Sequence, residues 1–237
     1  MTQFQFLAET GSTNADLKAR LLSGEPFEEG FWLIADRQTR GRGREGRDWI
    51  DGQGNFMGST LVRPSPGNPP APSLALVAGL AVCGAVASFI PDDAKAMLKW
   101  PNDVLVAGAK IAGILLEGVE SAIIVGIGVN LVSAPEIAGR ATTSLGKSGR
   151  APARDAFAVT LADCFAEELD RWRRFGLGAL IQRWTCAAHP EGTPLRVIEP
   201  GGMIAHGTFA GLDPDGALCL RLADGATRVI HAADVEL

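Results

Sequence analysis

The segment 36–48, here called the arginine-rich loop, brings together residue types that could neutralise a phosphorylated ligand. It holds five arginines, three acidic residues and three glycines, a local net charge of +2 in a chain of net charge −5. Arginine presents forked donors that match phosphate or carboxylate oxygens, and glycine allows backbone N–H groups to come close to a bulky anion. A solvated surface loop would carry similar charges, but the alternation of glycine with arginine and the closing Trp49 favour polyanion binding.

Three further segments place polar side chains beside apolar runs. The sequence KWPND at 99–103 presents amide and carboxylate groups, although an ordinary turn has the same composition. Lys110 begins the apolar run 110–117, where its ammonium either extends to solvent or stabilises negative charge in a cleft. In the run 125–131, two glycines remove side chains from a strand, and Asn130 needs hydrogen-bond partners if it is buried.

No standard nucleotide-binding or metal-binding fingerprint accounts for these segments. The sequence has no P-loop motif, and GRGREG at 41–46 follows a loop and leads to no apolar helix, which argues against a Rossmann fold. The four cysteines have no CxxC spacing and no partnering histidines, so neither a zinc site nor a redox pair is indicated. This use of cysteine favours a reducing, cytoplasmic compartment.

The elements that must position these residues begin with a short helix and two strands. A helix is predicted over 14–23 from the preceding Ser-Thr-Asn and the spacing of its leucines, and strands are predicted over 31–35 and 55–62. Four strand-like segments follow between 96 and 131, with joints too short to hold helices. The pattern predicts an α+β fold with a mixed, largely antiparallel sheet.

Later segments predict helices and then a separate group of strands. Residues 73–90 carry no charge, but their Ala, Gly and Ser content favours a helix buried in protein over a membrane span, which needs ~20 apolar residues. Apolar positions spaced by three and four predict helices over 154–175 and 177–185. Short strands separated by Gly- and Asp-containing turns then predict a small barrel. We therefore divide the chain into domains at 1–189 and 190–237.

The composition argues against several other classes of protein. With 46% hydrophobic and 21% charged residues in 237, the chain is typical of a globular protein rather than a disordered one. The acidic net charge argues against a general nucleic-acid binder, whose phosphate contacts need a surplus of Lys and Arg. The N-terminal sequence lacks the basic start and apolar run of a signal peptide. Glycine is the outlier, with 29 residues, which indicates many tight turns or close approaches of the backbone.

Taken together and in this order, the polar segments resemble the signature sequences of the biotin protein ligases. They are GSTN at 11–14, RQTRGRGREGRDW at 37–49, KWPNDV at 99–104, KIAGILLE at 110–117 and VGIGVNL at 125–131. The resemblance covers nearly the whole chain. It implies a catalytic domain of the class II synthetase-like type followed by a small SH3-like β-barrel. It also implies that biotin and ATP form biotinyl-5'-AMP and pyrophosphate, and that the biotinyl group then moves to a lysine of a carrier domain.

The resemblance assigns roles to residues at the matching positions. The implied catalytic residues are Arg42 and Lys110, and Lys110 would contact both the carboxylate being activated and the α-phosphate. The residues implied for biotin are Ser12, Thr13, Asn14, Gln38, Gly41, Arg42, Gly43, Arg44, Lys110 and Gly113. Those implied for the nucleotide are Arg44, Arg47, Trp49, Asn102 and Asn130, with Asp103 as a ligand of Mg²⁺.

The same resemblance implies a biotin carboxyl carrier protein or domain as the partner, such as that of acetyl-CoA carboxylase. The short segment before Gly11 leaves no room for the helix-turn-helix of the family's repressors, so we expect no DNA binding, and we expect no membrane binding. A homodimer through exposed sheet edges is a further prediction. Two alternatives stay open: a lipoate or octanoate ligase of the same fold, and a non-enzymatic RNA-binding module built on the arginine-rich loop.

One residue of the arginine-rich loop departs from the family's pattern. Glu45 stands where a basic or neutral residue is expected. We predict that it pairs with Arg42 or Arg47 in the free protein and so holds the loop away from the ligand.

Overall fold

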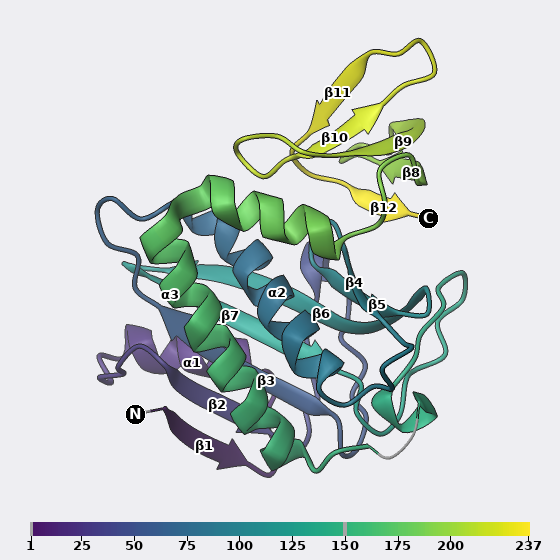
Figure 1. Ribbon diagram of the computed structural model, residues 1–237. Coiled ribbons are helices and arrows are strands. Elements are labelled where there is room, and N and C mark those ends of the chain that lie inside the picture. The colour runs from purple at the N-terminus through teal and green to yellow at the C-terminus, as the bar shows by residue number, and fades with distance from the viewer. Residues whose placement is uncertain (1, 149–150) are drawn as a thin grey trace.

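The computed structural model describes residues 2–148 and 151–237, which form a seven-stranded sheet, a five-stranded sheet and three α-helices (Figure 1). The elements of the larger sheet and its helices are β1 (Gln3–Leu7), α1 (Thr13–Leu22), β2 (Phe31–Ala35), β3 (Phe56–Val62), α2 (Leu74–Ala87), β4 (Ala96–Lys99), β5 (Asp103–Val106), β6 (Ala109–Val119), β7 (Ala122–Val129) and α3 (Arg154–Ala187). Those of the smaller sheet are β8 (Pro194–Ile198), β9 (Ile204–Leu212), β10 (Leu218–Arg221), β11 (Thr227–Ile230) and β12 (Asp234–Glu236). Short 3-10 helices lie at Arg44–Gly46, Ala71–Ser73 and Leu145–Ser148.

The larger sheet is mixed and largely antiparallel, as predicted. Its strand order is β1-β2-β3-β7-β6-β5-β4. β1 and β2 run parallel, since α1 connects them, and the five other neighbouring pairs are antiparallel. β7 therefore lies between β3 and β6 and is hydrogen-bonded along both of its edges.

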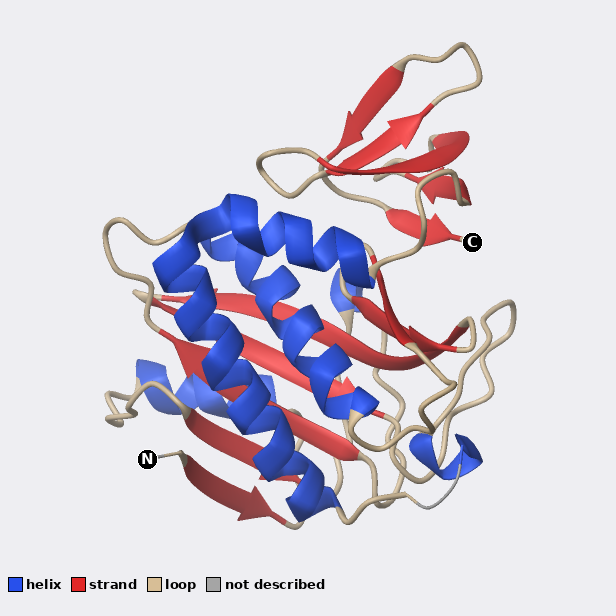
Figure 2. Cartoon of the chain, in the orientation of Figure 1, coloured by secondary structure: helices blue, strands red, loops and turns tan. Residues whose placement is uncertain are grey.

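Helices cover both faces of this sheet. α2 and α3 pack together over one face (Figure 2), where Trp32 and Ile34 of β2 join their core. α1 lies on the opposite face, where its Leu17 packs against Leu33 of β2 and Ile124 of β7. Successive residues of a strand point to opposite faces, so β2 contributes alternately to the two cores.

The apolar segment 73–90 forms the buried helix that its composition predicts. α2 runs from Leu74 to Ala87, and leucine, valine and alanine side chains along it are buried in the larger core. Across the described residues, no helix has both the length and the apolar character that a membrane span requires.

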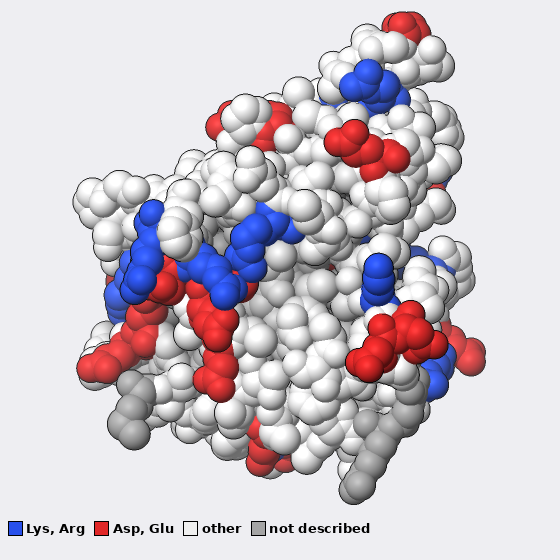
Figure 3. Space-filling model, viewed as in Figure 1, with Lys and Arg blue, Asp and Glu red and all other residues white. Residues whose placement is uncertain are grey.

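The two predicted C-terminal helices of this domain are one element with a break. α3 runs from Arg154 to Ala187, but Gly176 has φ +75° and ψ −173°, where the helix changes direction. The buried carboxylate of Glu168, before the break, accepts a hydrogen bond of 2.6 Å from Arg183 after it. On the face that α3 covers, basic and acidic side chains interleave (Figure 3), as in the 2.7 Å ion pair between Arg173 and Glu29.

The smaller sheet confirms the predicted strands but not a closed barrel. Its order is β11-β10-β9-β8-β12, and every neighbouring pair is antiparallel. β11 and β12 lie at opposite ends of this order, and within the described part of the chain no pairing joins them. The reason is that β12 has three residues, pairs with β8 along one edge, and directs Asp234 toward the larger domain.

The break in α3 predicts opposite effects for two neighbouring glycines. An alanine at Gly176 would have to adopt a backbone conformation that is nearly exclusive to glycine, so Gly176→Ala should lower the free energy of unfolding by about 1–3 kcal/mol. Gly178 is exposed, helical and surrounded by open space, so Gly178→Ala should raise it by about 0.5–1 kcal/mol. Urea denaturation of both variants measures this, and equal effects would show that the break is not required.

Candidate active site

A pocket of about 510 Å³ lies on the face of the larger sheet that also carries α1. Its walls come from the start of α1, the arginine-rich loop, the β4–β5 turn, the middle of β6 and β7, and β12. Every residue that the resemblance assigns to the site lines this pocket except Gly41. Gly41 is buried beneath it, where a Cβ atom would lie 2.7 Å from the carbonyl oxygen of Trp49.

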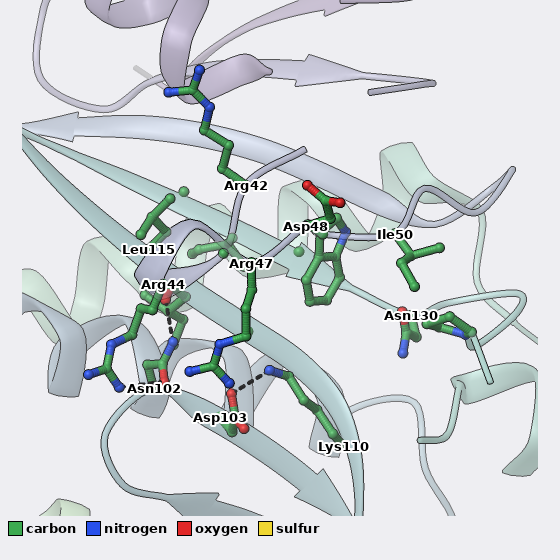
Figure 4. Close-up of a pocket in the computed structure, with 18 of the residues that line it drawn as sticks. Arg42, Arg44, Arg47, Asp48, Ile50, Asn102, Asp103, Lys110, Leu115 and Asn130 are labelled. Carbon is green, nitrogen blue, oxygen red and sulfur yellow. Dashed lines mark hydrogen bonds and ion pairs between the residues drawn. The ribbon is translucent and has the colours of Figure 1, made fainter. Parts of the chain in front are cut away.

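Lys110 and Asp103 form a close ion pair inside the pocket (Figure 4). The Lys110 Nζ lies 2.6 Å from one carboxylate oxygen of Asp103, and the Lys99 Nζ lies 3.5 Å from the other. The register of β5 and β6 explains this proximity, because Asp103 pairs with Gly113 and Lys110 with Leu105. Burial and the nearby cations Lys110 and Arg140 lower the pKa of Lys99, despite its carboxylate neighbour.

The arginines of the loop divide into two groups. Arg44 donates to the Asn102 side-chain oxygen at 3.4 Å, and Arg47 lies 2.5 Å from Asp234 of β12. Arg42 is exposed, and its guanidinium points away from the Lys110 centre (Figure 4). The structure therefore directs Arg44 to Asn102 and Arg47 to Asp234, whereas the Arg42 guanidinium has turned away.

Glu45 pairs with the arginine-rich loop's own cations. Its carboxylate lies 3.1 Å from Arg47 and 4.0 Å from Arg44, and among the ion pairs of the described residues it has none with Arg42. Glu45 also has a positive φ of 57°, which is uncommon for a residue with a side chain. Of the two partners predicted for Glu45, the structure shows Arg47.

The glycines of β6 and β7 make room for protein side chains. Gly113 and Gly128 are cross-strand partners, and the Trp49 indole lies over both, so that a Cβ on Gly128 would be 2.4 Å from its ring. A Cβ on Gly126 would be 2.3 Å from the Asn14 side-chain oxygen. The sequence predicted that such glycines allow close approach; in the structure the approaching groups are the indole and the amide.

A buried polar network forms the end of the pocket beside α1. Gln38 accepts hydrogen bonds from the Thr13 backbone N–H at 2.7 Å and from the Thr13 hydroxyl at 3.1 Å. Ser59 of β3 lies 2.7 Å from the Thr13 hydroxyl and donates to Asn14 at 2.6 Å. Asn14 in turn donates to Glu117 at 2.8 Å. These groups offer a ligand fixed hydrogen-bond donors and acceptors at the end of the pocket beside α1.

Asn130 presents an unused acceptor at the other end of the pocket. Its side-chain nitrogen donates to the Thr143 carbonyl at 3.1 Å, as a buried amide requires. Its side-chain oxygen is buried and has no hydrogen-bond partner within the described residues. A ligand N–H group would satisfy this oxygen.

Sequence reasoning missed five residues that complete the site. They are Ser59, Lys99, Glu117, Arg140 and Asp234. Lys99 lies within KWPND, so its motif was the available signal. Asp234 is 187 residues from its partner Arg47, and no local pattern indicates such a pair.

The charges lining the pocket suit an anionic ligand. Six basic side chains line it, against three acidic ones. Two of the carboxylates, Asp103 and Asp234, are in ion pairs with those cations. The arrangement can hold phosphate and carboxylate groups together and stabilise negative charge that develops between them.

His189 is a buried titratable group just outside the pocket. The preceding Ala188 forms a bridge with Leu98, which brings the end of α3 beside β4. The His189 Nε2 is buried and has no partner in the described part of the chain. Burial and the nearby Lys99 ammonium lower the pKa of His189 below its ordinary 6.5.

Comparison with known proteins assigns this fold and site to a family. Residues 8–131 match the model of the biotin/lipoate A/B protein ligase family, and residues 192–237 match that of the biotin protein ligase C terminal domain. The biotin–(acetyl-CoA-carboxylase) ligase of Paracoccus denitrificans is 40% identical over 97% of this chain and 98% of its own length. That of Mycobacterium tuberculosis is 39% identical over 98% and 88%.

A solved structure agrees with these sequence matches. The biotin protein ligase of Aquifex aeolicus, in complex with biotin and ATP, superposes with a TM-score of 0.85 at 27% identity, over the whole of this chain and 98% of that one. This agreement in fold over the full length places the chain among the protein ligases. The chain belongs to the biotin/lipoate A/B protein ligase family.

The lowered pKa of His189 predicts a loss of stability in acid. As pH falls below about 6.5, the unfolded state takes up a proton on His189 more readily than the native state does. The contribution of neutral His189 to the free energy of unfolding is therefore present above that pH, and it is lost as pH falls through the pKa of His189 in the folded protein. His189→Gln should remove this dependence, whereas the exposed His206→Gln should keep it. Urea denaturation between about pH 5 and 8 measures it; parallel curves for wild type and His189→Gln would contradict the prediction.

Proposed function

We propose that this chain is an ATP-dependent biotin protein ligase. It activates biotin as biotinyl-5'-AMP, releases pyrophosphate, and transfers the biotinyl group to a lysine of a biotin carrier domain such as that of acetyl-CoA carboxylase. The observation that carries the proposal is that Lys110, Arg44 and Arg47 line one pocket. The buried polar network beside α1 forms one end of the same pocket and could hold the biotin ring. The family match and two ligases at 39% and 40% identity support the choice of biotin.

Lys110 is the proposed catalytic residue of the first step. A biotin carboxylate oxygen forms a bond to the α-phosphorus while the bond to pyrophosphate breaks, so two anions must approach each other. The Lys110 ammonium stabilises the charge that accumulates between them, provided that it exchanges its 2.6 Å pair with Asp103 for the ligand. Lys99 lies 3.5 Å from Asp103 and keeps that carboxylate paired.

The nucleotide is proposed to lie between the indole and the arginines. Trp49 offers its ring for stacking on adenine, and the unpartnered side-chain oxygen of Asn130 can accept from the adenine amino group. Arg44, Arg47 and Asn102 surround the proposed position of the phosphates. Arg47 binds Asp234 in the absence of ligand, so phosphate competes with that carboxylate for it.

Biotin is proposed to place its ring system in the network at the start of α1. Ser12, Thr13, Asn14 and Gln38 line that end of the pocket, and Gly113 leaves space beside Lys110. Gly41 acts from below by allowing Trp49 to pack closely. Arg42 and Gly43 reach the carboxylate and phosphates when the arginine-rich loop moves over the ligand, because the Arg42 guanidinium points elsewhere in the free protein (Figure 4). An ordered loop would also exclude water from the mixed anhydride.

Mg²⁺ is proposed to enter with the triphosphate. The described residues contain no cluster of three or more metal-ligating side chains, and both Asp103 oxygens face lysines. These residues fit a Mg²⁺ ion that keeps phosphate and water as most of its ligands, with Asp103 as one carboxylate. Such an ion would neutralise phosphate charge.

The remaining expectations are proposals from the sequence. The division into domains at 1–189 and 190–237 is supported by the end of α3 at Ala187 and the start of β8 at Pro194. A cytoplasmic location rests on cysteine usage, and a homodimer rests on unpaired sheet edges such as that of β1. Lipoate or octanoate transfer is the competing activity, since the family model covers lipoate ligases as well.

The proposed function is tested by incubating a biotin carrier domain with the protein, biotin and Mg-ATP. Mass spectrometry should show one added biotinyl group. Pyrophosphate exchange into ATP should depend on biotin. Exchange that responds to lipoate but not to biotin would assign the protein to the lipoate branch, and salt-sensitive RNA binding without exchange would remove the enzymatic assignment.

Lys110→Ala should lower the rate of biotin-dependent pyrophosphate exchange by about 100- to 1000-fold, because the charge that develops at the α-phosphate loses its counter-ion. The fold should persist, since Lys99 still pairs with Asp103. Lys95→Ala is the matched control, because Lys95 is exposed and outside the pocket. Near-normal exchange in Lys110→Ala would remove the residue from its proposed role.

A further inference from the structure

The Asn14 side chain lies over a glycine of the sheet, between the side chains of Ser59 and Glu117. Gly126 of β7 is directly below it, and a Cβ there would overlap its amide. Gly126 pairs with Ser59 of β3 on one side and with Leu115 of β6 on the other. Ser59 bonds to the Asn14 oxygen, and Glu117, two residues along β6 on the same face, bonds to the Asn14 nitrogen.

The carboxylate of Glu117 decides the direction of every hydrogen bond in this chain. A carboxylate can only accept, so Asn14 must turn its NH₂ group to Glu117 and its oxygen to Ser59. The Ser59 hydroxyl then donates to Asn14, and its oxygen accepts from the Thr13 hydroxyl at 2.7 Å. The Thr13 oxygen is left with lone pairs for a ligand N–H. Gln38 is oriented separately, because its oxygen accepts from the Thr13 backbone N–H. At 3.1 Å that oxygen is a more distant acceptor for the single Thr13 hydroxyl proton than the Ser59 oxygen at 2.7 Å.

The surroundings of Glu117 support a role in orientation rather than in ion pairing. Among the ion pairs of the described residues, none includes Glu117. Its hydrogen-bond partner is a neutral amide whose residue is 4% exposed. Glu117 does not line the pocket itself, so its effect on a ligand passes through Asn14.

We propose that Glu117 is a positioning residue that sets the polarity of the Asn14–Ser59–Thr13 chain and thereby selects an acid whose ring carries N–H donors. The inference rests on the proposed function. Biotin's ureido ring has two N–H groups, whereas the dithiolane ring of lipoate has none. A site built to accept hydrogen bonds discriminates strongly against an analogue that lacks the donors.

Glu117→Gln tests this role with almost no change in shape. Glutamine can present either an oxygen or an NH₂ group, so the reversed chain becomes comparable in energy. In that chain the Thr13 oxygen accepts from Ser59 and the Thr13 proton turns to Gln38, which leaves fewer lone pairs for a ligand N–H. We expect KM for biotin to rise about tenfold, with kcat and KM for ATP within about twofold of wild type. The preference for biotin over lipoate in pyrophosphate exchange should fall by a similar factor.

A double-mutant cycle of Glu117→Gln with Ser59→Ala tests whether the two residues act through one hydrogen-bonded chain or make independent contacts. Either single change breaks the chain, so the double variant should have a KM for biotin no higher than about twice that of the worse single variant. Glu120→Gln, on the exposed turn between β6 and β7, is the matched control and should leave KM unchanged. Thermal unfolding of each variant verifies that it is folded.

The outcomes distinguish this inference from the proposed function. If the wild-type protein forms no biotinyl-AMP, the proposed function fails. If the wild type is active but Glu117→Gln keeps its KM for biotin, or raises both KM values equally, or multiplies its effect with that of Ser59→Ala, then the positioning role is wrong and the proposed function stands.

Discussion

The absence of side chains at two successive positions on one face of β7 is the constraint on which the pocket depends. Gly126 and Gly128 leave the backbone bare, and Asn14 and Trp49 occupy positions where a Cβ would lie 2.3 and 2.4 Å from their atoms. Because β7 is hydrogen-bonded on both edges, this floor is held in place. The start of α1 and the end of the arginine-rich loop are thereby positioned against one rigid surface.

Charge balance is the second constraint, and it connects the two sheets. The cations of the pocket outnumber its carboxylates, and their mutual repulsion contributes to the lowered pKa of Lys99. Asp103, the first residue of β5, and Asp234 of β12 offset that repulsion. An anionic ligand would take over this neutralisation, so binding of phosphate and release of these internal ion pairs are linked.

Much of the fold could be predicted from local sequence. Apolar spacing predicted α1 and both parts of α3, and an uncharged composition rich in small residues predicted α2. The break at Gly176 falls between the two helices that were predicted separately. The short joints between strands indicated antiparallel pairing, which the structure confirms. The prediction of a closed C-terminal barrel was wrong. Closure would need β11 to pair with β12, and it depends on what Asp234 of β12 contacts; the composition of single strands reports neither.

The sequence by itself determined the chemistry of the site, because residue types and short spacings are local: a loop of arginines and glycines, a lysine before an apolar strand, and an amide at the end of another. Only the tertiary structure decided which of these groups act together. It turned Arg42 outward, paired Arg47 with Asp234 across 187 residues, and placed Glu117 behind Asn14. Such pairings follow from the register and packing of distant elements, and no local pattern encodes them.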